Sequence, residues 1–542
     1  MKIKFISLLL VAISMLQADE ITLKQLEQWP KSYSRDFFIW RYLDQNISAK
    51  SADKAFYLIN SVNWSLLHRY AKKTKKPRFK MADKCHFLKP KDLPAKDPSC
   101  SAIAITPYKF SKLSSSKQSE LIKQLKNFPN IVKWMRVMAS NDPFLTLIEA
   151  DSDTFFKIYN QCGRVWRNKF LNHPLPQKLI DQLATRKEFA QTIKLIVTDN
   201  NMIDAQKSLF KVDSKKLNHQ STFFLAMNAI NFGRINQAKK YLESAYKKAY
   251  YRFDLDKTLF WLAQVDPKGK HLDELLKSFD INIYTLYARE LKKLPLPKVV
   301  TPDFKKSGCD FNISNPFEWI PVLRQIKNYS SDKLTKLAKK FSCDETEGHY
   351  SFLMERAARY RTEYFPMPYK NAYKDLPKND QALILALARQ ESRFIPSSIS
   401  TSYALGMMQI MPFLVKSLAK ELKEPFDLDK MFDPIINISY AKQHLKFLKR
   451  SLYHPLFIAY AYNGGIGFTK RLLKKRGLFK KGKFEPWLSM ELVYYDESRR
   501  YGKKVLANYI VYKNLLGEPI DVVSSVESLT KPDRTDRFRA SK

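Results

Sequence analysis

Residues 381–394 read QALILALARQESRF, an apolar run that ends at a single carboxylate, Glu391. Every residue from 382 to 388 is Ala, Leu or Ile, and neither glycine nor proline interrupts the run. The PKND of residues 377–380 is a helix start signal, so the pattern predicts a helix that continues to Glu391. A helix that is apolar on all sides is normally buried. The stretch therefore predicts a core helix with an acid at its end.

Glu391 has two interpretations on these residues alone. A carboxyl held against apolar groups loses hydration, which disfavours the charged form and raises its pKa. A carboxyl with a raised pKa suits a general acid near neutral pH. Alternatively, Glu391 is a surface residue paired with Arg389 or Arg393, and a close pair would lower the pKa instead.

Composition and periodicity predict a mainly α protein of several domains. A chain of 542 residues exceeds one hydrophobic core. Residues 222–252, TFFLAMNAINFGRINQAKKYLESAYKKAYYR, have apolar side chains three and four apart on both sides of Gly233. This pattern predicts a helical hairpin in which Ala238, Leu242 and Ala245 face the partner helix. Hairpins in series over residues 19–299 predict an α-superhelix, with an irregular all-α domain as the alternative.

The first residues, MKIKFISLLLVAISMLQA, have the pattern of a secretory signal peptide over residues 1–18. Two lysines precede an apolar stretch that is too short to span a membrane comfortably. An uncleaved N-terminal anchor is the alternative. No later segment has the length of a transmembrane helix, so we expect a periplasmic protein without stable membrane insertion.

Five cysteines fit an oxidising compartment and leave one thiol unpaired. We expect the local pairs Cys85–Cys100 and Cys309–Cys343, with Cys162 free. The connectivity does not follow from sequence alone, because several pairings are open to five cysteines.

The formal net charge is +41, which indicates an anionic partner. Nucleic acid, an anionic membrane surface and a cell-wall polymer are the candidates. A lysine-rich composition without such a partner is the alternative, because the lysines are spread along the chain. Export makes nucleic acid the least suitable partner, and we predict no nucleic-acid binding.

Two proline-rich breaks divide the rest of the chain. Residues 294–312, LPLPKVVTPDFKKSGCDFN, read as a linker, and YFPMP at 364–368 marks a second break. We therefore expect a linker domain over 300–368 with one or two helical hairpins, and a chemically distinct domain over 369–520. The polar tail, 521–542, is predicted to be disordered.

The domain over 369–520 carries four short motifs in order. They are Glu391-Ser392, Gly406-Met407-Met408-Gln409, Ala461-Tyr462-Asn463, and Glu497 followed by Arg499 and Tyr501. Together they resemble the motifs of the soluble lytic transglycosylases of the Slt type, in the lysozyme-like superfamily. Met407 stands where the family has Leu, which is a volume-conserving exchange. The resemblance covers residues 369–517.

This resemblance implies a fold that is mainly α, with a large α-superhelical N-terminal domain, a small helical linker domain and a C-terminal lysozyme-like catalytic domain. It also implies peptidoglycan glycan strands as substrate, with cell-wall synthesis or remodelling proteins as possible partners. The family cleaves the β-1,4 bond between N-acetylmuramic acid and N-acetylglucosamine without consuming water and leaves 1,6-anhydromuramoyl ends. No cofactor and no metal are expected.

Carried over by motif, Glu391 is the catalytic acid, then base, and Tyr462 orients either the substrate N-acetyl group or Glu391. The remaining predicted residues line the substrate cleft: Ser392, Gln409, Met411, Asn463 and Glu497. Most glycosidases use two carboxyl groups, whereas residues 392–406, SRFIPSSISTSYALG, contain no acid. A single carboxylate suits a reaction in which the substrate's own N-acetyl oxygen stabilises the anomeric carbon. A hydrolytic muramidase and a non-catalytic cell-wall scaffold are the alternatives.

Overall fold

The structure is a computed structural model that describes residues 20–475 and 477–540. Helices and isolated β-bridges make up its regular structure, and these residues form no extended strand. The mainly α fold predicted from the sequence is confirmed. The predicted signal peptide, 1–18, lies outside the described residues. Within the described ranges, no helix combines the length and apolarity needed to cross a membrane.

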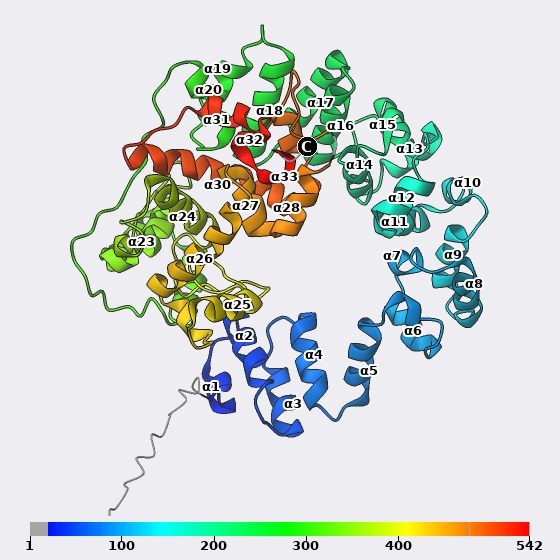
Figure 1. The fold of residues 1–542 in the computed structure, drawn as a ribbon, viewed down its shortest axis with the longest axis horizontal. Helices are drawn as coiled ribbons and strands as arrows, with labels where there is room; N and C mark the ends of the chain where they lie inside the picture. Colours follow the sequence, from blue (N-terminus) through cyan, green and yellow to red (C-terminus); the bar gives the residue numbers. More distant parts are fainter. Residues whose placement is uncertain (1–19, 476, 541–542) are drawn as a thin grey trace, which may run out of the picture.

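The superhelical segment, up to residue 299, follows a curved path of short helices that forms most of a ring (Figure 1). Its helices are α1 (Leu23–Gln28), α2 (Tyr33–Tyr42), α3 (Ala49–Tyr57), α4 (Trp64–Lys73), α5 (Pro77–His86), α6 (Pro98–Ala104), α7 (Pro107–Phe110), α8 (Ser115–Gln124), α9 (Pro129–Met138), α10 (Pro143–Ile148), α11 (Ser152–Gln161), α12 (Arg164–Phe170), α13 (Gln177–Leu183), α14 (Phe189–Val197), α15 (Ile203–Ser208), α16 (His219–Asn231), α17 (Ile235–Lys248), α18 (Arg252–Val265), α19 (His271–Leu276) and α20 (Ile283–Leu291).

The hairpin predicted at 222–252 is confirmed by α16 and α17, which pack against each other. Ala238, Leu242 and Ala245 are fully buried. Gly233 has φ 72°, a left-handed conformation that glycine adopts without strain, and it ends the first helix of the pair. Apolar spacing therefore set both the helices and the face that each one buries.

The linker segment contains α21 (Trp319–Gln325), α22 (Ser331–Ala338) and α23 (Glu347–Ala357), and α22 packs on α23 as a hairpin. It has its own small core around Trp319, Phe341 and Leu353. Cys309 and Cys343 form a disulfide in this segment, Cys85 and Cys100 form another in the superhelix, and Cys162 is free and buried. The expected cysteine pairing is confirmed.

The C-terminal segment is built around two buried helices. Its helices are α24 (Lys378–Glu391), α25 (Pro412–Leu422), α26 (Pro434–Lys449), α27 (Pro455–Gly464), α28 (Ile466–Leu473), α29 (Trp487–Glu491) and α30 (Asp496–Leu515). Helix α24 has the predicted bounds, and its residues from 381 to 389 are buried. It packs along α30, which also packs along α27.

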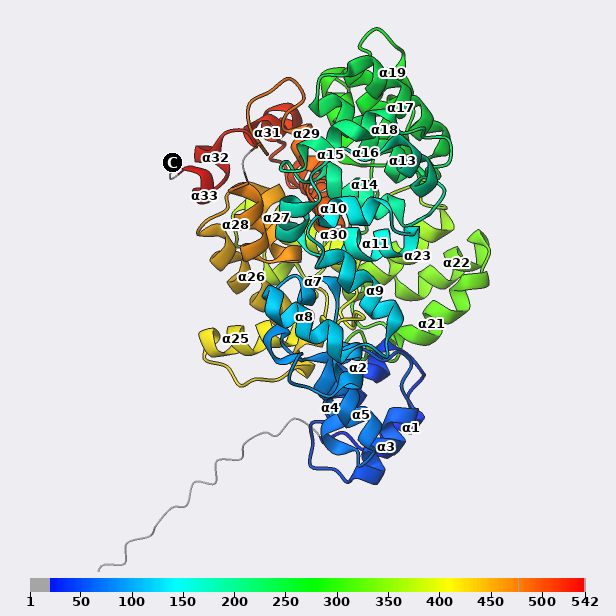
Figure 2. The same cartoon turned by 90° about the vertical axis from the view of Figure 1, so that its right-hand side faces the viewer.

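The tail is helical, so the prediction of disorder over 521–542 is wrong for its described part. Helix α31 (Val522–Ser528) packs on α20, while α33 (Arg537–Ala540) packs on α28 and α32 (Pro532–Thr535) packs on α33 (Figure 2). Val522, Val526 and Leu529 are buried, at the spacing of one helix face. The many polar residues between them concealed this narrow apolar stripe.

The ring is closed by contacts between the start of the superhelix and the C-terminal segment. Arg41 on α2 donates two hydrogen bonds to the Asp429 carboxylate, at 2.5 and 2.8 Å. The Tyr403 ring lies 5.5 Å from the Trp40 ring. Residues almost 400 positions apart in sequence therefore meet at this junction.

A second junction joins the far end of the superhelix to α30. The Tyr284 hydroxyl on α20 donates to the Glu491 carboxylate, and Lys503 Nζ lies 2.6 Å from Glu491 Oε2. All three side chains are buried. Buried polar groups need such partners because leaving one unpaired is costly. The superhelix is thus fixed to the C-terminal segment at both ends.

Candidate active site

Glu391 is the last residue of α24 and lies half-buried at the wall of a cavity. Burial raises its pKa from 4.5 to about 7, a hydrogen bond from Tyr501 lowers it, and the nearby Glu497 carboxylate raises it. The C-terminal end of a helix dipole also disfavours a negative charge. Glu391 therefore holds a proton close to neutral pH, as a general acid must.

Tyr501 on α30 is the residue that holds the Glu391 carboxyl group. Its hydroxyl lies 2.6 Å from Glu391 Oε1. The motif resemblance implied this role for Tyr462 as one of two options, but the Tyr462 hydroxyl donates to the Met408 carbonyl oxygen at 2.8 Å. Burial raises the pKa of Tyr462, and the nearby Glu391 charge raises it further. Of these two tyrosines, Tyr501 is the one that makes the hydrogen bond to Glu391.

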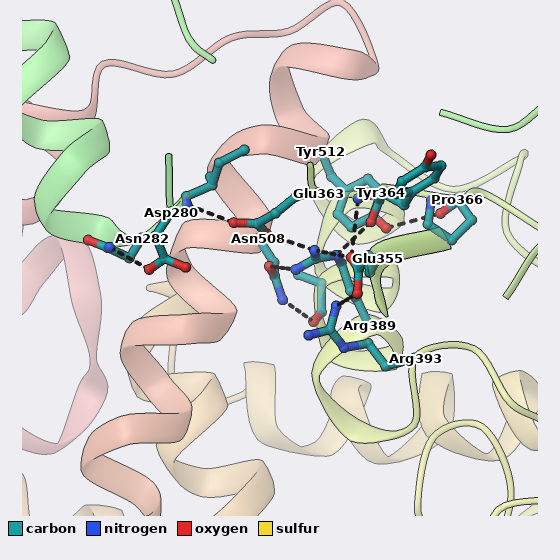
Figure 3. Close-up of polar contacts among 12 residues, drawn as sticks. Asp280, Asn282, Glu355, Glu363, Tyr364, Pro366, Arg389, Arg393, Asn508 and Tyr512 are labelled. Carbon is teal, nitrogen blue, oxygen red and sulfur yellow. Dashed lines mark hydrogen bonds and ion pairs between the residues drawn. The ribbon is translucent and has the colours of Figure 1, made fainter. Parts of the chain in front are cut away.

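Arg389 and Arg393 bind other carboxylates, so neither lowers the Glu391 pKa through an ion pair. Arg389 Nη2 lies 3.0 Å from Glu355 Oε1 and 2.8 Å from Glu363 Oε2, and Arg393 also pairs with Glu355. Figure 3 shows this cluster, in which both guanidinium groups converge on Glu355. The surface-pair interpretation of Glu391 is therefore wrong.

The loop at residues 403–411 is held by its own backbone hydrogen bonds and by Asn437. Asn437, buried on α26, accepts from the Met408 amide at 2.7 Å and donates to the Leu405 carbonyl at 3.3 Å. Gly406 has φ 76°, and a Cβ at this position would collide with the Met431 carbonyl oxygen. Only glycine allows this approach. Asn437 was not predicted, because nothing local marks it as a loop support.

Ser392 and Gln409 make internal hydrogen bonds. Ser392 Oγ donates to the Met407 carbonyl at 2.8 Å and accepts from the Ile395 amide. Gln409 Nε2 donates to the Gly406 carbonyl at 2.7 Å, and its φ of 50° is left-handed. Both side chains hold the turn that follows α24. Their predicted contact with substrate stays a prediction.

Asn463 and Glu497 are hydrogen-bonded to each other and line the same cavity as Glu391. Asn463 Nδ2 donates to Glu497 Oε1 at 2.8 Å, and Asn463 Oδ1 accepts from Ser498 Oγ. Gly465, with φ 84°, ends α27 directly after Asn463 and Gly464.

Met411, half-buried, lines a separate cavity of about 650 Å³ at the junction with α2 and α4.

A cavity of about 520 Å³ brings Glu391, Asn463, Glu497 and Tyr501 together. Gln220, from α16 of the superhelix, also lines it, so the site is not made by the C-terminal segment alone. Sequence reasoning missed Gln220, because a half-buried glutamine on a helix carries no signal of its own. An open cavity with a protonatable acid can protonate a leaving oxygen and take a proton back.

Residues 368–484 match the family model described as Transglycosylase SLT domain. The chain is 28% identical over 171 residues to the soluble lytic murein transglycosylase of Escherichia coli (strain K12), covering 30% of this chain and 26% of that protein. It is 32% identical over 107 residues to the membrane-bound lytic murein transglycosylase C of Sodalis glossinidius, covering 18% and 30%. The matched regions span less than a third of these relatives.

Two solved structures align with most of this chain. An inactive mutant of the lytic transglycosylase Slt from Pseudomonas aeruginosa has a TM-score of 0.48 at 16% identity, covering 91% of this chain and 88% of that one. The 70 kDa soluble lytic transglycosylase from Escherichia coli has a TM-score of 0.47 at 15% identity, covering 93% and 83%. The sequence matches confirm, for the C-terminal segment, the resemblance based on its four motifs.

Proposed function

We propose, from the transglycosylase SLT domain at residues 368–484, that this protein is a peptidoglycan lytic transglycosylase. The observation that supports it most is the state of Glu391. It is an acid with a pKa raised to about 7, hydrogen-bonded by Tyr501 and open to a cavity. We assign the activity to the periplasm because residues 1–18 have the pattern of a signal peptide.

The reaction uses one carboxyl group twice. Protonated Glu391 gives its proton to the glycosidic oxygen as the bond from that oxygen to the muramoyl anomeric carbon breaks. The N-acetyl oxygen of the same sugar stabilises the anomeric carbon. The sugar's 6-hydroxyl oxygen then attacks that carbon, and its proton returns to Glu391. Because both groups belong to one bound sugar, the second step is effectively unimolecular.

Glu497 favours a second candidate, a hydrolytic muramidase. It is a carboxylate in the same cavity, close enough to raise the pKa of Glu391. Two carboxyl groups across a glycosidic bond are the usual arrangement for hydrolysis. Glu497 also accepts hydrogen bonds from Asn463 and Tyr495, so we assign it to substrate contact.

Mass spectrometry of digested sacculi separates the two reactions. Digestion in water labelled with heavy oxygen should give muramoyl ends that lack one water and carry no label, because the acceptor is internal. Labelled, reducing muramoyl ends would establish hydrolysis. Glu497→Gln should keep the anhydro product and lower its rate of formation through weaker binding. Complete loss of turnover in Glu497→Gln would support a second catalytic carboxylate.

The pH dependence of kcat/KM should report the Glu391 proton. Activity requires the protonated acid, so kcat/KM should fall as pH rises through about 7. Tyr501 donates to the carboxylate and stabilises its charged form, so Tyr501→Phe should raise the pKa and move the alkaline limb to higher pH. Tyr509→Phe, on the same helix but bonded to Asn379, should leave the limb in place. A limb that moves to lower pH in Tyr501→Phe would contradict the assignment.

A further inference from the structure

Two cations on α30, Arg500 and Lys504, line the cavity that contains Glu391. They are one helical turn apart, so their side chains share a face, and like charges at this spacing destabilise a helix. Both residues are exposed. Neither forms an ion pair with any of the described residues. The chain thus keeps an unfavourable pair of positive charges beside its catalytic acid.

The residue that precedes each of them has an acidic partner. Arg499 Nη2 lies 2.5 Å from Asp496 Oδ1, and Lys503 Nζ lies 2.6 Å from Glu491 Oε2. These two cations are buried and serve the fold. The RRYGKK stretch, 499–504, therefore alternates between paired cations that face inward and unpaired cations that face the cavity.

The cavity's own carboxylates are already engaged. Asp496 is bonded to Lys194 Nζ at 2.7 Å as well as to Arg499. Glu497 accepts from Asn463 and Tyr495. Among the described residues, none of the three acids that line this cavity forms an ion pair with Arg500 or Lys504.

Lys504 lies in a positive region. Loss of hydration is the largest cause that lowers the pKa of Lys504. Repulsion from Arg393, Arg500 and Arg389 lowers it further, whereas the Asp280 carboxylate raises it. A second cavity of about 390 Å³ shares Lys504 and Gln390 with the first. It lies between the superhelix, the linker and α24, and part of its lining appears in Figure 3. Space for a ligand thus continues past Lys504, away from Glu391.

We propose that Arg500 and Lys504 form an anion subsite that binds carboxylates of the stem peptide carried by the muramoyl residue cleaved at Glu391. This inference rests on the proposed function. That residue must lie beside Glu391, so its peptide leaves the sugar within the same cavity. Charged hydrogen bonds to carboxylates are stronger than neutral ones. The superhelix forms part of this subsite through Gln220 and Arg252, which line the two cavities.

The test compares glycan strands that differ only in stem-peptide charge. Peptide-bearing strands are used as they are or after their peptide carboxylates are converted to amides, and peptide-free strands carry a lactyl carboxylate instead. For the natural chain, amidation should raise KM about five- to tenfold and leave kcat nearly unchanged. Arg500→Gln/Lys504→Gln should show the same rise on untreated strands and no further effect of amidation.

Lys336→Gln/Lys340→Gln is the matched control. These lysines are also exposed, unpaired among the described residues and one turn apart, but they lie in the linker segment, at α22 and the turn after it. The control removes the same charge and should keep the natural response to amidation. The subsite would be overturned if amidation still raised KM for Arg500→Gln/Lys504→Gln. It would also be overturned if amidation no longer raised KM for the control, Lys336→Gln/Lys340→Gln. If the double variant raised KM for peptide-free strands alone, Arg500 and Lys504 would bind the lactyl carboxylate, and the stem-peptide subsite would also be overturned.

Binding measurements on the Glu391→Gln background keep this inference separate from the proposed function. There, peptide-bearing fragments should bind more weakly after amidation, and the added Arg500→Gln/Lys504→Gln change should abolish that difference. An unaltered difference overturns the subsite, whatever the activity. If Glu391→Gln instead cleaves sacculi at the normal rate, the proposed function fails, while loss of the binding difference still supports the anion subsite.

Discussion

Glu391→Gln should lower the rate of muropeptide release from sacculi by roughly a thousandfold, the expected size of a lost general acid. Glutamine keeps the shape of the side chain and an oxygen to accept from Tyr501, which lies 2.6 Å from Oε1. It cannot give or take the proton. The rate is measured by chromatography of released products, with Glu27→Gln, an exposed change on α1, as control.

The same variant should not lose stability, and this separates catalysis from folding. The Glu391 pKa is raised from 4.5 to about 7, so the folded state binds its proton more tightly than the unfolded state does. The natural chain therefore loses stability as pH rises from about 4.5 to about 7, and the deficit stays constant above that range. Glutamine does not ionise, so its melting temperature should equal or exceed that of the natural chain at pH 8.

A normal release rate in Glu391→Gln would favour the non-catalytic scaffold. A low rate together with a clearly lower melting temperature would indicate that Glu391 supports the fold instead. The proposed acid requires the low rate and the preserved melting temperature in one preparation.

Arg389→Met should destabilise the protein by about 3–5 kcal/mol, because it leaves the Glu363 carboxylate without a cation and Glu355 with Arg393 alone. Arg389 also donates to Asn508 Oδ1 at 2.8 Å and to the Tyr364 carbonyl at 3.0 Å. Glu363 accepts from the Ile281 amide at 2.7 Å. The cluster in Figure 3 therefore joins α24 and α30 to the linker and the superhelix. Unfolding is followed by urea titration.

Two further variants test the cause of that loss. Arg186→Met removes a half-exposed partner of Asp153 and should cost far less stability, because surface ion pairs contribute little. Adding Glu355→Gln and Glu363→Gln to Arg389→Met removes the uncompensated charges and should recover much of the stability. Equal losses in Arg389→Met and Arg186→Met would show that the buried cluster contributes little. No recovery on removal of both acids would assign the loss to packing, since Arg389 also lies over the Phe365 ring.

Catalytic activity should fall in Arg389→Met and recover in the triple variant, in parallel with stability. Arg389 lies two residues before Glu391 on the last turn of α24. Loss of its partners would loosen that turn and the placement of the acid, and the triple variant should regain rate along with stability.

The sequence by itself determined the features that depend on residues close to one another along the chain. Apolar spacing fixed α24 from Lys378 to Glu391 and the hairpin of α16 and α17, because a helix buries one repeating face. The motif order identified Glu391, and its place after an apolar run indicated a raised pKa. The tail shows the limit of this reasoning, since Val522 and Val526 form too narrow a stripe to stand out in a polar segment.

Only the tertiary structure decided which distant groups meet. Tyr501 reaches Glu391 across 110 positions, Asn437 supports the loop at 403–411, and Gln220 joins the cavity from the superhelix. The tertiary structure also places Arg389 and Arg393 against Glu355. Neither arginine therefore pairs with Glu391, whose pKa stays raised. A hydrogen bond or an ion pair depends on distance in space, and helical periodicity records only which face is buried. The sequence therefore determined the acid and its helix, while packing determined its pKa and its partners.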